Sequence, residues 1–444
     1  MRKPFVTACL VAVWLSIVSG IAFALPPVQR TVLDNGLVLL VSEEHSLPFV
    51  TMYLMVKTGS KDDPAGREGL ADLTAASLLF GAAGRTLQQI NEEIDFMGAR
   101  LNSAAGKDYT AVTLRALTKD LDRSVSIFMD AVMKPTFPEN EIKKEISRTL
   151  GAIQSSEDQP GYVAERAFQK ALYLDGPYGH PAEGTKESVG KLTPRMVKQF
   201  HQDYYHPNNS ILVVVGDVSQ QELSRSIVKR LEMWPRKAIP ESKALFSAAQ
   251  KKQVIKVGKP VTQSNIIIGN RGMSRDNPDY YAATVMNHIF GGGGLTSRLM
   301  QEIRNKRGLA YSAASFFEAR KYGGSFQIHL QTKLPSTDEA IKVAMEDLVR
   351  IRTELVSPEE LEDAKKYLVG NFPQKLSTQS RIASFFGQVE YFGLGLDYPA
   401  RYPSLINSIS REDIRRVAQT YLQPDASITV IVTRLKEAED EKVK

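Results

Sequence analysis

Cysteine is almost absent from this sequence of 444 residues, which has only Cys9. Cys9 lies inside an apolar N-terminal stretch rather than at its end, so it is poorly placed for lipid attachment. Without that stretch the chain has no cysteine, which excludes both a disulfide framework and a thiol nucleophile. The fold must therefore be held together by its core.

A large excess of charge is also absent. The 56 Lys and Arg residues and 50 Asp and Glu residues give a formal net charge of +6. This mild balance gives no reason to expect a nucleic-acid partner. The length is sufficient for two domains of ordinary size, each with its own core.

The N-terminus has the order of a secretory signal peptide. Arg2 and Lys3 precede an apolar run, Phe5–Ala24, that ends in Ala-Phe-Ala. We predict that residues 1–24 are removed, which lowers the formal charge to about +4. An uncleaved membrane anchor is the alternative, because the run is nearly long enough to span a bilayer. Its two serines and its glycine favour removal. An exported chain without disulfides suits a bacterial periplasm, so we expect a periplasmic or secreted protein with no stable membrane anchor.

Two stretches of the chain repeat one plan. LTPRMVKQFHQDYYHPNNSILVVVGDV, from Leu192, and ISREDIRRVAQTYLQPDASITVIVTRL, from Ile409, each contain a capped helix, a proline at a matching position and a β-branched strand. A second pair repeats a helix start at nearly the same offset: FPENEIKKEISRTL, from Phe137, and VSPEELEDAKKYLV, from Val356. Two repeats in the same order predict a duplicated α/β unit.

The stretch between the two copies, Trp234–Lys252, is polar and carries prolines, as a linker does. We therefore predict an N-terminal domain over residues 25–233 and a C-terminal domain over residues 253–444. In both domains, β-branched runs alternate with segments of helical periodicity. Strands are expected at Phe49–Val56, Asn265–Gly269 and Ser325–Gln331.

The most distinctive stretch is GGGGLTSRLMQEIRNKRGLAY, which ends at Tyr311. It opens with four glycines, whose backbone amides could cradle an anion. No Lys-Ser/Thr pair follows them, as a phosphate-binding loop requires. Thr296 or Ser297 is better placed to cap the next helix. The four glycines are Gly291, Gly292, Gly293 and Gly294.

The end of the same stretch carries a cation and a phenol. Arg304 is expected near the end of a helix, Gly308 at its C-cap and Tyr311 at the start of the following strand. Such a turn can bring both side chains to one surface, where a hydroxyl donor and a fixed cation stabilise an oxyanion more than the ground state. On spacing alone, the commoner outcome is an arginine in a surface salt bridge and a buried tyrosine.

These segments resemble the peptidase M16 family (pitrilysin and mitochondrial processing peptidase), in particular its short bacterial subunits. The resemblance implies an α+β fold of two duplicated domains, each a mostly antiparallel sheet packed with helices, which together form half of a clamshell. It also implies that Arg304 and Tyr311 contact the bound substrate, and that Gly291–Gly294 border the peptide cavity. Matching segments include VLDNGLVLLVSEEHSLPFV, VKTGSKDDPAGREGLA, YGHPAEGTKESVGKLT, YYHPNNSILVVVGDV and IFGGGGLTSRLMQEIRNKRGLAYSAASFF.

The zinc site of that family is not matched. Active members read G-x-A-H-x-x-E-H, with two zinc-binding histidines and a glutamate base, and here those three positions hold Asp72, Ala75 and Ala76. The third ligand of the family, a glutamate, falls at Ala152. Zinc needs three protein donors and an open position for water, and alanine supplies no donor. The two closest of the six histidines have the wrong spacing for one helix face.

The resemblance therefore implies a non-catalytic subunit of a two-component zinc endopeptidase, inactive alone and without a cofactor of its own. Zinc is expected in a partner M16 chain with the intact motif, and extended peptides are the expected substrates. A scaffold or peptide-holding protein is an alternative from a different class, because loss of the zinc ligands fits it equally well. Retention of Arg304 and Tyr311 favours the subunit. A self-sufficient zinc protease is disfavoured by the missing ligands.

Overall fold

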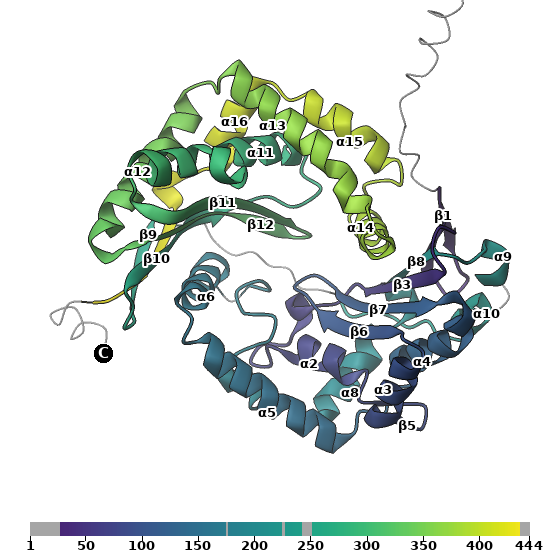
Figure 1. The fold of residues 1–444 in the computed structure, drawn as a ribbon. Helices are drawn as coiled ribbons and strands as arrows, with labels where there is room; N and C mark the ends of the chain where they lie inside the picture. The colour runs from purple at the N-terminus through teal and green to yellow at the C-terminus, as the bar shows by residue number, and fades with distance from the viewer. Residues whose placement is uncertain (1–26, 175, 224–226, 242–250, 436–444) are drawn as a thin grey trace, which may run out of the picture.

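The computed structural model describes residues 27–174, 176–223, 227–241 and 251–435. The predicted signal peptide, residues 1–24, lies outside these ranges. Within them, no helix combines the length and the apolar character needed to cross a bilayer. The described chain forms two halves, each a sheet with helices, coloured purple to teal and green to yellow in Figure 1.

The N-terminal half is built on a six-stranded sheet in the order β1-β2-β8-β3-β7-β6. Strands β2 and β8 pair in parallel, and the other neighbours pair antiparallel. All of β8 and nearly all of β3 are buried, so both faces of the sheet must be covered at its centre. The strands are β1 (Val28–Val32), β2 (Val38–Glu43), β3 (Phe49–Val56), β6 (Arg100–Ala105), β7 (Thr110–Leu117) and β8 (Ser210–Gly216).

Helices of the same half form a shared core with this sheet. Thr86 and Thr193 cap two of them through their side chains. Trp234 is buried in the same core, so the predicted linker begins as part of the N-terminal half. The main helices are α2 (Leu70–Ser77), α3 (Leu87–Phe96), α4 (Leu121–Met133), α5 (Glu139–Ser156) and α8 (Pro194–Tyr204). Shorter elements are β4 (Gly81–Ala82), β5 (Arg85–Thr86), α7 (Lys186–Val189), α9 (Gln220–Leu223) and α10 (Lys229–Glu232).

The C-terminal half is built on a five-stranded sheet in the order β11-β12-β10-β13-β9, in which only β13 and β9 pair in parallel. The strands are β9 (Gln253–Gly258), β10 (Gln263–Arg271), β11 (Ala310–Arg320), β12 (Gly323–Lys333) and β13 (Ile428–Thr433). The helices are α11 (Tyr280–Asn287), α12 (Thr337–Thr353), α13 (Pro358–Asn371), α15 (Tyr398–Asn407) and α16 (Arg411–Tyr421).

The duplication seen in the sequence is present in the fold. Helices α8 and α16 begin after the caps Thr193 and Ser410, and each is followed by a single 3-10 turn and then a strand, β8 or β13. Helices α5 and α13 are the second matching pair. The three strands expected from the sequence are confirmed as β3 and as parts of β10 and β12. The α+β fold of two similar, mostly antiparallel halves is therefore as predicted.

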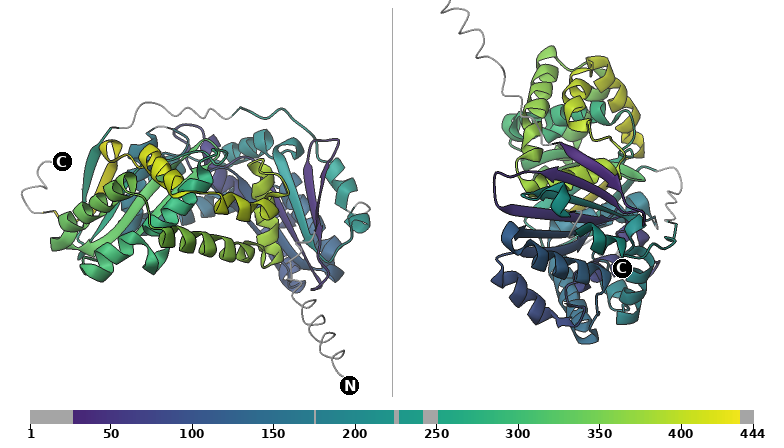
Figure 2. Two further views of the ribbon diagram at one scale, coloured as in Figure 1. Left: turned by 90° about the horizontal axis from the view of Figure 1, so that it is seen from above. Right: turned by 90° about the vertical axis from the view of Figure 1, so that its right-hand side faces the viewer.

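Each half also lends one helix to the other. Helix α6 (Pro160–Tyr173), from the N-terminal half, packs on β10 and β13, and α14 (Gln379–Tyr391), from the C-terminal half, packs on β3 and β8. Figure 1 shows these two helices between the sheets, and Figure 2 shows the same arrangement from two other sides. Phe168 of α6 lies against Gly269 of β10, where an added Cβ would come within 2.7 Å of its ring. The exchange covers the second face of each sheet.

Polar contacts reinforce this exchange. Arg30 of β1 donates two bonds from Nε and one from Nη2 to Glu390 of α14, at 2.8–3.1 Å. Asp108, in the loop between β6 and β7, is buried and accepts a hydrogen bond from the Tyr178 hydroxyl. Its other oxygen accepts the backbone N–H of Lys321, from the turn between β11 and β12, at 3.4 Å. The two halves therefore pack as one unit.

Candidate functional site

The N-terminal half holds the positions of the family's zinc site on helices α2 and α5. Helix α2 begins after Gly69, and the half-buried carboxylate of Asp63 accepts the backbone N–H groups of Gly69 and Ala71 at 2.8 and 2.7 Å. These bonds satisfy amides that the start of a helix leaves free. Helix α2 is thus fixed in place and packs against α5.

The side chains at the zinc positions are unsuited to a metal. Ala75 is fully buried, Ala76 is half-buried and Ala152 is exposed. At these positions α2 and α5 therefore carry methyl groups, which cannot bind a metal. Among the residues that the structure describes, no three His, Cys, Asp or Glu side chains gather as a metal site requires. The chemistry of these residues does not fit zinc, which takes three protein donors.

Asp72 is the one acidic side chain among these positions, and its surroundings disfavour its charge. Burial, with the charges of Glu183 and Glu145 nearby, raises the pKa of Asp72 to about 6, while the charge of Arg148 acts in the opposite direction. Arg148 is itself engaged by Glu145, with Nε 2.8 Å from Oε2. The surroundings of Asp72 are therefore set by other charged side chains of the protein.

The C-terminal half brings Arg304 and Tyr311 together. Arg304 lies in the π-helix η7 (Met300–Lys306), and its Cζ is 5.2 Å from the centroid of the Tyr311 ring. Gly308 follows the helix with φ +62°, and its N–H donates to the carbonyl of Arg304, so the predicted C-cap is confirmed. Tyr311 is 73% exposed. In the described part of the chain, Arg304 has no carboxylate within ion-pair distance.

A β-bulge directs Tyr311 outward. Ala310 pairs with Thr332 and Ser312 pairs with Gln331, so Tyr311 is an extra residue in β11. Tyr311 and Ser312 are both exposed, whereas Ala310 and Ala313 on either side are buried. Because π-helices and bulges recur at functional sites, their coincidence here marks this segment as specialised. The pair is open to a ligand, which neither a surface salt bridge nor a buried tyrosine would be.

Two sets of ion pairs hold the helix that carries Arg304. Arg298 donates from Nε and Nη2 to Glu360 of α13, at 2.6 and 2.8 Å. Glu302 accepts from Lys306 at 2.7 Å and from Arg307 at 2.6 Å, and these bonds lower the pKa of Glu302 to about 2.

The sequence analysis did not identify these contacts, although one clue was present. Glu360 is the third residue of α13, where it completes a capping box with Ser357. The S-P-E-E pattern predicts this box. It does not reveal that the same carboxylate also receives Arg298 from another helix, because that contact depends on the tertiary packing.

The four glycines lie before that helix: Gly291 and Gly292 end the π-helix η5 (His288–Gly292), and Gly294 begins the 3-10 turn η6 (Gly294–Thr296). A Cβ at Gly291 would lie 2.6 Å from the backbone nitrogen of Ser315, and one at Gly293 would lie 2.7 Å from the His288 carbonyl. Gly294 has φ +65°, which favours glycine. Close packing thus explains several of these glycines. Their predicted role at a peptide cavity stays a prediction.

The helix after these glycines begins at Arg298, directly after Ser297. The Ser297 hydroxyl donates to the carbonyl of Gly294 instead of accepting a helix N–H. Thr296 likewise donates its hydroxyl, to the carbonyl of Gly293. The predicted start of the helix is therefore correct, but neither side chain caps it.

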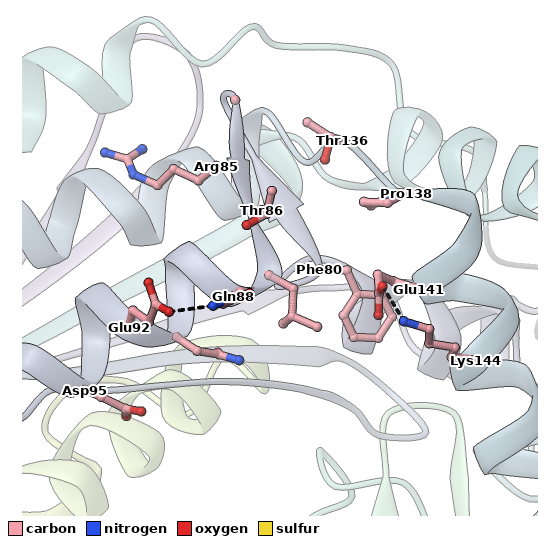
Figure 3. Close-up of a pocket in the computed structure, with 13 residues that line it drawn as sticks. Phe80, Arg85, Thr86, Gln88, Glu92, Asp95, Thr136, Pro138, Glu141 and Lys144 are labelled. Atoms are coloured by element: carbon pink, nitrogen blue, oxygen red, sulfur yellow. Dashed lines mark hydrogen bonds and ion pairs between the residues drawn. The ribbon is translucent and has the colours of Figure 1, made fainter.

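A surface hollow of about 800 Å³ lies apart from both places, between α3, β5 and the start of α5. In Figure 3, Glu92 is bonded to Gln88 and Glu141 to Lys144. Both carboxylates are thus already paired with neighbouring side chains. None of the predicted site residues lines the hollow. Its size alone does not make it the functional site.

Comparison with known proteins agrees with the fold and with the family resemblance. The sequence profile of the insulinase family (peptidase family M16) matches residues 38–186, and that of the peptidase M16 inactive domain matches residues 191–368. The chain is 26% identical over 414 residues to an uncharacterized zinc protease of Streptomyces coelicolor, covering 91% of this chain and 89% of that protein. It is 25% identical to a non-peptidase homolog of Helicobacter pylori, covering 90% and 92%.

A crystal structure of a peptidase M16 inactive domain from Pseudomonas fluorescens superimposes with a TM-score of 0.86 at 28% identity. The match covers 92% of this chain and 98% of that one. The two family profiles and this structure agree on one fold across both halves. The positions that bind zinc in active members hold Asp72, Ala76 and Ala152, and the position of the general base holds Ala75. The chain therefore belongs to the peptidase M16 family, as an inactive-type member.

Proposed function

We propose that this chain is the non-catalytic subunit of a two-component, exported M16-type zinc endopeptidase. A partner M16 chain with the intact motif supplies the metal, its ligands and the general base. This chain forms the other half of a clamshell and presents Arg304 and Tyr311 to the peptide held between the two. The observation that carries the proposal is that the half-buried Arg304 lies beside the exposed Tyr311 without an ion-pair partner in the described chain, although the zinc ligands are missing.

The chemistry of the pair suits a peptide carbonyl under attack. The carbonyl oxygen gains negative charge in the transition state, and the Tyr311 hydroxyl donates a hydrogen bond to it. Arg304 adds a fixed positive charge beside the same oxygen. Such interactions accelerate the reaction because they are stronger in the transition state than in the ground state. Removal of one donor of this kind typically costs about 3 kcal/mol of barrier.

Strand β11 offers a way to hold the peptide. It is the outermost strand of its sheet in the described chain, so one row of its backbone groups has no neighbouring strand except at Arg320, which bridges Ser274. An extended peptide adds to such an edge through backbone hydrogen bonds, which makes recognition depend on extended shape more than on sequence. Tyr311 lies at the start of this edge.

Reconstitution tests the proposal. The purified chain alone should not cleave peptides, and addition of an M16 chain with the full zinc motif should restore cleavage. Tyr311→Phe or Arg304→Ala should lower kcat/KM by about a hundredfold, the usual effect of losing one oxyanion donor. The complex itself, measured by size-exclusion chromatography, should persist.

Tyr367→Phe is the matched control, because Tyr367 is an exposed tyrosine on α13 of the same half. Its hydroxyl has no proposed part in the reaction, so this variant should keep full activity. If Tyr311→Phe behaved like Tyr367→Phe, the proposed role of Tyr311 would be wrong. A subunit that holds peptides without assisting hydrolysis would then be the better description.

A further inference from the structure

One face of β11 and β12 forms a continuous strip next to the Arg304 and Tyr311 pair. Beyond the bulge, alternate residues of β11 point to opposite faces of the sheet. Ser315 faces the helices, since its hydroxyl donates to Asn287 of α11 at 2.7 Å. Ser312, Ala314 and Phe316 therefore line the opposite face, which α6 covers over the neighbouring strands β10 and β13.

The cross-strand partners of these residues are polar. Ser312 pairs with Gln331, Ala314 with His329 and Phe316 with Gln327. This strip is defined by these six residues and begins beside Tyr311. Its far end is aromatic, because Phe316 is 50% exposed and lies edge-to-face with His329, with ring centroids 5.0 Å apart.

A carboxylate from the other half of the chain borders the same end. Glu165 of α6 accepts a hydrogen bond from Gln169 at 2.7 Å and lies 3.4 Å from the Nε2 of Gln327. Its second oxygen, Oε2, is 3.7 Å from Nε2 of His329. Within the described residues, no lysine or arginine lies within ion-pair distance of Glu165, and its side chain is 32% exposed.

The imidazole of His329 donates from Nε2 and can accept a hydrogen bond at Nδ1. Its Nε2 is 2.7 Å from Oε1 of Gln327, an amide oxygen that only accepts, so Nε2 carries the hydrogen. In the neutral ring Nδ1 is then left as an acceptor. Burial lowers the pKa of His329, which favours this neutral form. The group therefore offers an aromatic face, a carboxylate oxygen and an imidazole nitrogen, all suited to a cation.

We propose that Phe316, His329 and Glu165 form a subsite for a lysine or arginine side chain of the bound peptide. The ammonium or guanidinium lies over the Phe316 ring and pairs with Glu165, while its remaining hydrogens reach His329. The subsite rests on the proposed function, because it assumes a peptide that runs along β11. It narrows the substrate class to peptides with a basic residue.

The strand also sets the position of that residue. Tyr311 and Phe316 are five residues apart with one extra residue at the bulge, so they are separated by about 13 Å along the strand. An extended peptide advances by about 3.3 Å per residue. The basic residue is therefore expected about four positions from the peptide bond that Tyr311 contacts.

Binding of two labelled peptides to the purified chain tests the subsite. The peptides are fluorescein-labelled decamers of alanine, serine and glycine that differ in one central residue, lysine or glutamine. Fluorescence anisotropy should give a Kd about five- to tenfold lower for the lysine peptide, from one ion pair and one cation–π contact. Because the pair is partly exposed, 1 M salt should reduce the preference.

Variants of Glu165 decide whether the preference arises at this subsite. Glu165→Gln should abolish it, and Glu165→Lys should reverse it in favour of a matching glutamate peptide. Reversal is an outcome that a purely structural role of Glu165 would not produce. Glu346→Gln, an exposed position on α12, is the matched control and should leave the preference unchanged. Circular dichroism melting checks that each variant is folded.

The possible failures separate the two proposals. Equal affinity of the wild type for both peptides, or a preference that survives in Glu165→Gln, overturns the subsite. If in that case Tyr311→Phe still lowers kcat/KM of the reconstituted complex about a hundredfold, the proposed function stands without the subsite. If the chain alone binds neither peptide, the subsite is overturned, while the proposed function is decided by cleavage in the reconstituted complex.

Discussion

The two halves of this molecule share one plan but differ at corresponding sites. In the N-terminal half, α2 is fixed by Asp63 and packs against α5, as a metal-bearing helix pair would require, yet its two zinc-donor positions carry Asp72 and Ala76. In the C-terminal half, the half-buried guanidinium of Arg304 lies beside the exposed ring of Tyr311. Both halves are well packed, but only the C-terminal half presents polar side chains at the site proposed to act on the peptide.

The two halves also differ in how the surroundings of a carboxylate affect its pKa. Burial and the nearby carboxylates raise the pKa of Asp72 to about 6. Glu302 is surrounded by Lys306 and Arg307, so its pKa is lowered to about 2. One carboxylate is held in surroundings that disfavour its charge, and the other in surroundings that favour it. Substitutions at these positions should therefore have opposite effects on stability.

The largest expected effect comes from restoring the missing donors. The combined variant Asp72→His, Ala75→Glu, Ala76→His and Ala152→Glu should bind one zinc ion per chain, because α2 and α5 are already in contact. With zinc at a hundredfold above Kd, the free energy of unfolding should rise by about 3 kcal/mol. Metal analysis after dialysis and thermal melting with and without a chelator are the measurements.

The wild-type chain, treated in the same way, should bind no zinc and should melt at the same temperature with or without the chelator. A variant with only Ala75→Glu is the matched control, because it adds a carboxylate without the histidines. Zinc retained by the wild type would contradict the description of this site as unable to hold metal.

Much of the fold could be predicted from the sequence, because the signals are local. Strand β3 was predicted at its observed bounds because its apolar run is typical of a strand buried on both faces. The caps Thr193 and Ser410 marked the starts of the repeated helices. The exchange of α6 and α14 could not be predicted, since it depends on which sheet each helix reaches, and periodicity carries no such information.

The candidate site shows the same limit. The sequence located Arg304, Gly308 and Tyr311, and the C-cap could be predicted because glycine favours that conformation. The bulge that turns Tyr311 outward was not predicted. A bulge follows from the register between β11 and β12, which is fixed only when the sheet is assembled.

The exchanged helices allow a direct comparison of two glycines. A Cβ at Gly269 would lie 2.2 Å from the Phe326 carbonyl oxygen and 2.7 Å from the Phe168 ring. A Cβ at Gly387 of α14 would lie 3.1 Å from the Tyr53 ring, which would have to move by only a few tenths of an ångström. Gly269→Ala should therefore cost about 2–3 kcal/mol by overpacking. Gly387→Ala should cost about 0.5 kcal/mol or less, because alanine favours a helix. Urea denaturation measures both, and equal losses would contradict this account of the exchange.

A smaller effect is expected at Glu302, whose carboxylate is stabilised by its neighbours. Because the folded pKa is lowered from 4.5 to about 2, this stabilisation is fully present above pH 4.5 and is lost as the pH falls toward 2. Glu302→Gln should lower the free energy of unfolding by about 2 kcal/mol at pH 7, after allowance for solvent screening. At pH 3 the difference from wild type should be clearly smaller. Glu359→Gln, at an exposed position of α13, serves as the control, and a loss that did not depend on pH would point to packing instead.

The smallest effect, with the opposite sign, is expected at Asp72. Its folded pKa is raised from 3.8 to about 6, so the folded state binds the proton more tightly, and stability falls as the pH rises from about 4 to about 6. Asp72→Asn removes this cost and should stabilise the chain by about 1 kcal/mol at pH 8, but hardly at pH 4. Chemical denaturation at the two pH values measures the difference. A loss of stability at pH 8 would mean that the ionised carboxylate has a favourable partner, and the contrast between the two halves would not hold at this position.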